Sequence, residues 1–149
     1  GNPGLACRSL SEALASMPST VPDRWFARLY LLKPLSILTL AVFWLASGAI
    51  GAWQIEAAAA TLTAAGFASS MAKTSVMAGS VADIILGALV LHHRTAKVAL
   101  LGMIAFTLAY LAAATAVTPG LWADPLGPLV KAVPSLALTL LTLAILPER

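Results

Sequence analysis

Charged side chains are scarce in this sequence: Asp, Glu, Lys and Arg make up 10% of its 149 residues, whereas 60% are hydrophobic. A soluble globular domain carries about 25% charged residues, and a mean hydropathy of +0.91 lies far above what such domains show. The composition therefore excludes an ordinary soluble fold. The net charge of +3 does not indicate nucleic-acid binding, because most of the basic residues flank apolar segments, where they set membrane topology.

Cysteine and histidine are almost absent, which excludes several kinds of redox site. Cys7 is the single cysteine, so the chain cannot form an internal disulfide or a CxxC pair. His92 and His93 are adjacent, so a haem held between two helices would have no second histidine ligand. We predict no metal site. The sequence has no GxGxxG segment, and any NAD(P) site would have to belong to an upstream domain.

What the sequence does have is four long apolar segments, at residues 34–53, 74–91, 98–118 and 125–147. A helix needs about 20 predominantly apolar residues to cross a bilayer, so each segment is long enough for one span. We predict an all-α fold, a transmembrane four-helix bundle over residues 25–149, with an interfacial N-terminal helix. The first outer loop, residues 54–73, is apolar but too short to span, and we expect a short helix there.

Two of the four segments contain one charged residue each, Asp83 and Lys131. An ionisable group inside a span costs roughly 2.5–3.5 kcal/mol on insertion scales, so its presence indicates function by default. Measured from the predicted helix ends, the two residues lie at similar depth and can pair. Three interpretations stay open: an ion pair that fixes helix register, a ligand or proton site, and no contact at all.

Further polar and aromatic residues can join these charges in one pocket. On the fourth segment, one helix face carries a stripe of Lys131, Ser135, Thr139 and Thr142. Tyr110 and Trp44 lie near the middle of their spans. We therefore predict no catalytic residue, but a ligand-binding or internal polar pocket formed by Asp83, Lys131, Tyr110, Ser135 and Trp44.

Small residues predict where the helices pack, because in lipid they let helix backbones approach closely. The first span carries Ser47, Gly48 and Gly51. The second carries Gly79, Ser80, Asp83 and Gly87 on one face. The third carries Gly102, Ala105, Ala109, Ala112 and Ala116. We expect these faces to meet at the centre of the bundle.

The segment before the first span is basic and aromatic. Asp23 can cap a helix that begins RWFARLYLL, and we predict an interfacial anchor formed by Arg24, Trp25, Arg28, Tyr30 and Lys33. A short amphipathic helix over residues 8–17 precedes it. We expect residues 1–24 to be a linker or the tail of an upstream domain.

The distribution of Lys and Arg predicts the orientation of the bundle. Arg24, Arg28, Lys33, Arg94 and Lys97 fall on one side of four spans, and Lys73 on the other. The positive-inside rule makes the first side cytoplasmic. Both termini are then cytoplasmic, and Trp53 and Trp122 mark the outer interface.

Three sequence elements together resemble the DoxX-like membrane proteins: YLLKPLSILTLAVFWLASGAIG in the first span, Asp83 followed by Gly87, and DPLGPLVKAVPSLAL at the start of the fourth. The resemblance is strongest to the bacterial subgroup fused behind an NAD(P)-binding, short-chain-dehydrogenase-like domain. It implies a four-helix bundle in the cytoplasmic (inner) membrane and assigns no catalytic residue. The family takes its name from a subunit of a thiosulfate:quinone oxidoreductase. The predicted apolar pocket, edged with aromatics and one ion pair, would suit a quinone-like head group, and it would suit plain helix packing equally well.

Three functions stay open at this point. The first is a non-catalytic or quinone-proximal membrane anchor for a cytoplasmic redox domain or partner that binds NAD(P). The second is a small proton-linked transporter that uses Asp83 and Lys131, and the third is a purely structural assembly bundle. We expect the lipid bilayer and the redox domain as partners, no nucleic acid, and no cofactor within these residues, and we leave a homo-oligomer open.

Overall fold

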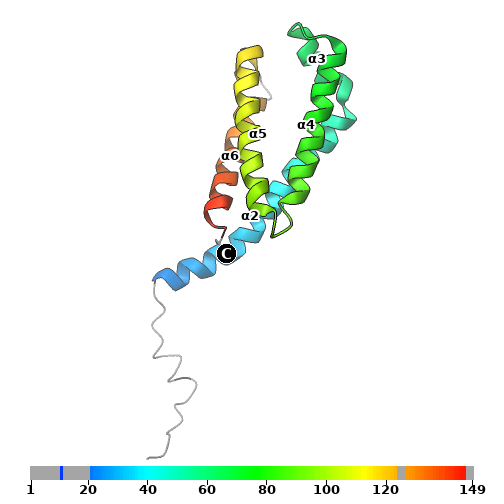
Figure 1. Ribbon diagram of the computed structural model, residues 1–149. Helices are drawn as coiled ribbons and strands as arrows, with labels where there is room; N and C mark the ends of the chain where they lie inside the picture. Colours follow the sequence, from blue (N-terminus) through cyan, green and yellow to red (C-terminus); the bar gives the residue numbers. More distant parts are fainter. Residues whose placement is uncertain (1–10, 12–20, 124–126, 147–149) are drawn as a thin grey trace, which may run out of the picture. The chain divides into compact units, whose positions relative to one another are not determined.

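The computed structural model describes residue 11, residues 21–123 and residues 127–146, with the backbone alone for residues 21–29 and 128. In these residues all regular structure is helical (Figure 1). The elements are α2 (Val21–Trp53), α3 (Ile55–Ala64), α4 (Ser69–Leu89), α5 (Ala96–Val117), the 3-10 helix η1 (Pro119–Trp122) and α6 (Pro128–Ala144). The chain divides into two compact units, Gly1–Leu32 and Lys33–Arg149. The helix predicted over residues 8–17 lies outside the described residues, except for Ser11.

Three of the described helices are long and apolar enough to cross a membrane. They are Tyr30–Trp53 within α2, with 24 residues, α4, with 21, and α5, with 22. At 1.5 Å per residue they measure about 32–36 Å, which suits a hydrocarbon core about 30 Å thick. These helices confirm the predicted all-helical membrane bundle.

The fourth helix, α6, is shorter than the apolar segment from which we predicted it. It has 17 residues, or about 25 Å, which is the lower limit for a span. It packs along α5, which also contacts α4. Pro134 lies inside α6, and Pro34 lies inside α2. Because proline has no N–H, each helix lacks one backbone hydrogen bond at its proline.

The short helix predicted within residues 54–73, the loop after the first span, is confirmed as α3. It folds back on α4 through a turn at Gly66, whose φ of 96° is a left-handed conformation that favours glycine. Ala59 and Ala72 are buried, and their small side chains allow the two helices to lie close together. At the side of this contact, Lys73 Nζ donates to Glu56 Oε1 at 2.6 Å.

The small-residue faces of α2 and α4 meet as predicted. A Cβ atom placed on Gly48 would lie 2.6 Å from the Ser80 carbonyl oxygen, and one on Gly51 would lie 2.5 Å from Ser80 Oγ. The two backbones can therefore approach this closely only because residue 48 is glycine, whereas at residue 51 an added Cβ would meet a hydroxyl that can rotate. The face on α5 follows the prediction in part: Gly102 packs against Leu86 of α4, whereas Ala105 and Ala109 are exposed.

An apolar core fixes the end of the bundle near the α4–α5 loop. Its buried members are Leu40, Ala41 and Trp44 from α2, Val90 from the end of α4, and Ala99, Leu100 and Met103 from α5. This cluster packs α2 against α5 near the α4–α5 loop.

Candidate functional site

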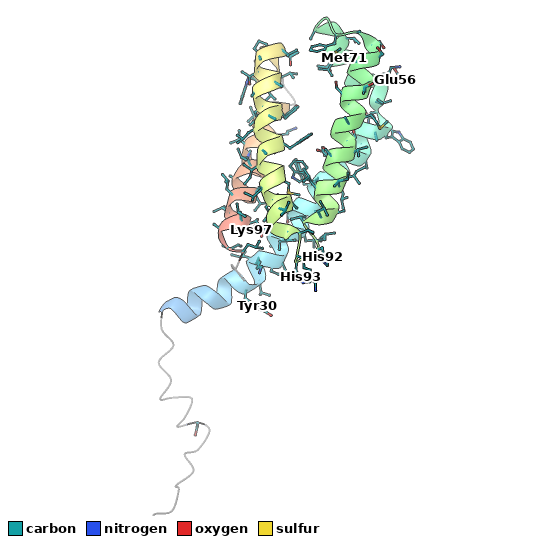
Figure 2. The ribbon with its side chains drawn as sticks, viewed as in Figure 1. Tyr30, Glu56, Met71, His92, His93 and Lys97 are labelled. Carbon is teal, nitrogen blue, oxygen red and sulfur yellow. The ribbon has the colours of Figure 1, made fainter. Side chains whose placement is uncertain are left out.

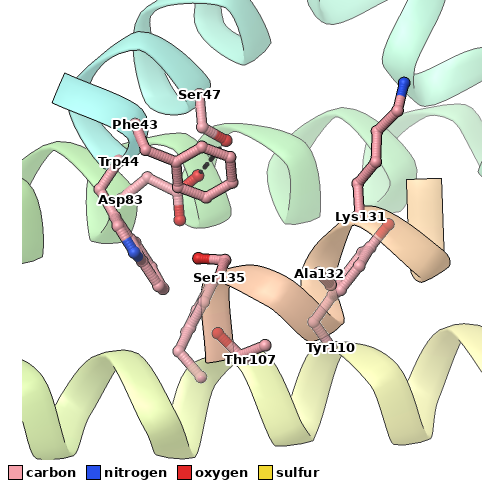
Figure 3. A pocket seen from close by; sticks show the side chains of 10 residues that line it. Phe43, Trp44, Ser47, Asp83, Thr107, Tyr110, Lys131, Ala132 and Ser135 are labelled. Carbon is pink, nitrogen blue, oxygen red and sulfur yellow. Dashed lines mark hydrogen bonds between the residues drawn. The ribbon is translucent and has the colours of Figure 1, made fainter. Parts of the chain in front are cut away.

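A cleft of about 220 Å³ lies between four helices and brings all five predicted pocket residues to one place (Figure 3). Its walls come from α2, α4, α5 and α6. The lining residues are Phe43, Trp44, Ser47, Asp83, Phe106, Thr107, Tyr110, Lys131, Ala132 and Ser135.

Asp83 is held in the cleft by the close crossing of α2 and α4. Ser47 Oγ donates to Asp83 Oδ2 at 2.8 Å. Ser47 precedes Gly48, whose missing side chain permits the short distance between the helices. The carboxyl is half-buried, and its second oxygen points away from Ser47 toward Ser135 of α6 (Figure 3).

Trp44 forms the buried aromatic wall. Its side chain is 4% exposed, and its ring packs against Phe106 of α5 with centroids 6.0 Å apart and planes tilted by 59°. This is a favourable geometry for an aromatic pair. Its indole Nε1 is buried and has no hydrogen-bond partner within the described part of the chain. Buried indole N–H groups usually find an acceptor.

Hydroxyl groups from α5 and α6 complete the polar lining. Thr107 and Tyr110 are three residues apart and so lie on one face of α5. Ser135 faces them from α6 (Figure 3). Each of the three hydroxyls can donate and accept a hydrogen bond.

Of the three interpretations left open for Asp83 and Lys131, the structure contradicts the ion pair. In the described part of the chain the two residues form no ion pair, and the Lys131 side chain extends away from Asp83 (Figure 3). The reason is the position of the helix ends. Because α4 begins at Ser69, Asp83 lies about 21 Å along it, whereas Lys131 lies only about 5 Å from the start of α6 at Pro128. Lys131 lines the cleft, but it is also exposed to the surroundings of the bundle.

The predicted polar stripe of α6 does not line the cleft along its whole length. Only Lys131 and Ser135 line the cleft. Thr139 Oγ1 donates to the Ser135 carbonyl at 2.8 Å, and Thr142 Oγ1 donates to the Leu138 carbonyl at 2.7 Å. Both threonines are buried. Their hydroxyls are therefore satisfied by their own helix and pack in the core instead of lining a pocket.

Sequence reasoning missed five residues that line the cleft: Phe43, Ser47, Phe106, Thr107 and Ala132. Two of them carried a usable signal. Ser47 lies three residues after Trp44, and Thr107 lies three residues before Tyr110, so each shares a helix face with a residue already chosen. The two phenylalanines resemble ordinary lipid-facing residues in the sequence.

The predicted interfacial residues are described only in part. Arg24, Trp25 and Arg28 lie within α2, but their side chains are outside the described residues. Tyr30 is 71% exposed, and Lys33 is half-buried.

The two ends of the bundle differ in composition, as Figure 2 shows. The α4–α5 loop carries His92 and His93, which are exposed, and Lys97 follows at the start of α5. Glu56 and Met71 lie at the other end, where α3 meets α4.

Comparison with known families bears on the same residues. The sequence profile described as the DoxX-like family matches residues 41–140, which is more than half of the chain. This chain belongs to the DoxX-like family. The matched range contains every residue that lines the cleft. The DoxX-like chain matches no curated protein and no solved structure.

The cleft of this DoxX-like domain has a definite chemical character. The polar residues of its lining are Asp83, Lys131 and four that carry a hydroxyl, Ser47, Thr107, Tyr110 and Ser135, and the other walls are aromatic or aliphatic. Such a mixture of apolar walls and a few convergent polar groups is typical of small-molecule sites. Its volume is below the range of about 300–1,000 Å³ that holds drug-sized ligands, so the cleft suits one small ring or a comparable head group.

Proposed function

We propose that this chain is a non-catalytic membrane domain that holds the head group of a lipid-soluble ligand, a quinone in the first instance, in the central cleft. In the same proposal it anchors a cytoplasmic redox domain or partner. The observation that carries the ligand proposal is the convergence of polar groups from four helices, three of them long and apolar enough to cross a membrane, on one cleft. Polar groups at membrane depth are costly, and close packing of the helices alone does not require them.

The size and the walls of the cleft favour a ring with an apolar tail. A single ring fits about 220 Å³, and it can pack against the aromatic rings of Trp44 and Phe106. The tail would then lie in lipid, which already solvates the exposed apolar side chains of α2, α4 and α5. A dinucleotide is too large for this space, so an NAD(P) site would belong to an upstream domain or to a separate partner.

The partner proposal depends on charge. Lys33, Arg94 and Lys97 lie at the end of the bundle that holds the α4–α5 loop. By the positive-inside rule we propose that this end faces the cytoplasm, together with both termini, in the cytoplasmic membrane. A soluble redox domain joined to α2 would then lie on that side, with residues 1–24 as its linker. We expect the purified chain neither to oxidise NAD(P)H nor to reduce a quinone analogue.

A proton-linked transporter is the less favoured alternative. It needs a charge pair or relay across the bundle, but Asp83 accepts from Ser47 while the Lys131 side chain extends away from it. Uptake driven by a proton gradient that disappears in Asp83→Asn would favour the transporter over the ligand-holding role.

The ligand proposal can be tested by filling the cleft. Ala132 lines it, whereas the next residue, Val133, is 48% exposed and does not. Organic extracts of the purified protein, analysed by mass spectrometry, should contain a quinone or a related ring compound in stoichiometric amount. That compound should be lost in Ala132→Trp and kept in the matched control Val133→Trp. Equal amounts in both variants, or none in the wild type, would refute the proposal.

A further inference from the structure

The cleft is closed toward the α4–α5 loop on all four of its walls. Helices α2 and α5 run away from that loop, and α4 and α6 run toward it (Figure 1). One turn nearer the loop than a cleft residue of the same helix lie Leu40 of α2, Met103 of α5 and Thr139 of α6, each at most 2% exposed. On α4 the corresponding residue is Gly87, which is buried against α2. These four residues form the floor of the cleft.

In the opposite direction the same four walls are open. Ser47 of α2, Tyr110 of α5 and Lys131 of α6 still line the cleft, and all three are exposed. On α4 the corresponding residue is Gly79, where an added Cβ would meet only the Phe106 ring, at 4.0 Å. Ser47, Gly79, Tyr110 and Lys131 form the rim of the cleft. The rim lies toward the end of the bundle where α3 packs on α4 and where α6 begins.

Building on the ligand site proposed above, we infer that the cleft is one-ended. The ligand enters and leaves it past the rim, and the floor bars passage toward the α4–α5 loop. The cleft therefore exchanges its ligand with the membrane face opposite His92 and His93, which the proposed orientation makes the outer face. The domain holds a ligand for that face and does not conduct it across the bilayer.

The physical reason is the difference between the floor and the rim. A ligand that passes through the floor has to part the close-packed core of Leu40, Leu100 and Met103. Its polar head group would also lose its hydrogen bonds among these apolar side chains, which is costly. Passage past the rim needs neither, because the cleft of about 220 Å³ is already open there and Tyr110 and Lys131 offer polar groups on the way.

The accessibility of single cysteines from each side of the membrane tests this inference. In a Cys7→Ala background, Ser135→Cys places a thiol in the cleft. Thr139→Cys, one turn away in the floor, is the matched control. Met71→Cys and His93→Cys report the two faces of the membrane, so the test does not depend on which face is outer. A permanently charged methanethiosulfonate reagent is applied to intact cells and to inverted vesicles, and the modified fraction is followed over time.

We expect Ser135→Cys to react at least about tenfold faster from the face on which Met71→Cys reacts, because a charged reagent cannot cross the apolar core below it. Thr139→Cys should stay unmodified from both faces. A short-chain quinone analogue should slow the reaction of Ser135→Cys and leave that of Met71→Cys unchanged. If Ser135→Cys does not fold, Ala132→Cys replaces it, because Ala132 also lines the cleft.

The outcomes separate this inference from the proposed function. Reaction of Ser135→Cys at an equal or higher rate from the His93 face would overturn the one-ended cleft, and so would reaction of Thr139→Cys as fast as Ser135→Cys. Absence of reaction at Ser135→Cys from both faces, in membranes and in vesicles reconstituted from detergent-washed protein, would also overturn it. One-sided reaction that the quinone analogue does not slow would uphold the one-ended cleft and count against a quinone as its ligand.

Discussion

Gly48→Ala should separate α2 from α4 and destabilise the bundle. The added Cβ would lie 2.6 Å from the Ser80 carbonyl oxygen, 2.7 Å from Ile84 Cγ1 and 3.0 Å from Asp83 Cβ. Ordinary contacts between heavy atoms begin near 3.5 Å, so the helices must part locally by about 1 Å. A backbone carbonyl cannot rotate out of the way as a flexible side chain can.

The magnitude follows from two terms. Overpacking in a close-packed interior costs about 1–3 kcal/mol. Moving the helices apart also weakens the hydrogen bond from Ser47 to Asp83, and such bonds within membranes are worth about 0.6 kcal/mol on average and up to about 1.7. We therefore expect Gly48→Ala to lose about 2–4 kcal/mol of unfolding free energy.

The assay is unfolding of the detergent-solubilised protein by SDS, followed by the fluorescence of its four tryptophans, of which Trp44 is buried in the bundle. Gly79→Ala is the matched control, because a Cβ there would meet only the Phe106 ring, at 4.0 Å. That variant should be neutral or slightly stabilising, since alanine favours helices. Gly51→Ala should fall between the two, because its close neighbour is the Ser80 hydroxyl, which can rotate. Equal stabilities of Gly48→Ala and Gly79→Ala would refute the close-packing argument.

Three further predictions concern the core, the hairpin of α3 and α4, and the orientation. Met103 is fully buried, so Met103→Ala should lower the unfolding free energy by about 2–5 kcal/mol in the same SDS titration. Leu101 is half-exposed, so the control Leu101→Ala should change it little. Similar losses in the two variants would contradict the core assignment. Lys73→Gln removes an exposed ion pair with Glu56 and should lower the unfolding free energy by at most about 1 kcal/mol, and by less in high salt. A larger loss would mean that α3 depends on that pair. In a Cys7→Ala background, an impermeant thiol reagent applied to intact cells should label Met71→Cys but not His93→Cys, and the reverse pattern would invert the topology.

The helices and the choice of pocket residues were within reach of the sequence. Runs without charge, such as residues 98–118, have few alternatives to a membrane helix. Asp83 and Trp44 stand out because a carboxyl at membrane depth and an aromatic near the middle of a span are rare enough to be noticed. Helical spacing then places Ser47 beside Trp44 and Thr107 beside Tyr110.

The helix ends and the directions of side chains were not within reach. The residues at 69–73 are mostly small or polar, so they gave no apolar signal, yet they continue α4 because α3 packs against it. That earlier start invalidates the depth match with Lys131. Likewise, the sequence cannot tell whether the Thr139 hydroxyl faces a cavity or bonds to the Ser135 carbonyl.

The central claim is that the cleft, and not the lipid-facing surface, holds a ring head group. It is tested most directly by photocrosslinking an alkyl quinone analogue that carries a diazirine beside its ring, in native membranes, and mapping the adducts by mass spectrometry. We predict adducts on the cleft residues of three helices, namely Phe43 of α2, Tyr110 of α5 and Ala132 of α6, and competition by unlabelled analogue. Adducts confined to lipid-facing positions such as Leu38 and Leu141, without competition, would contradict the claim.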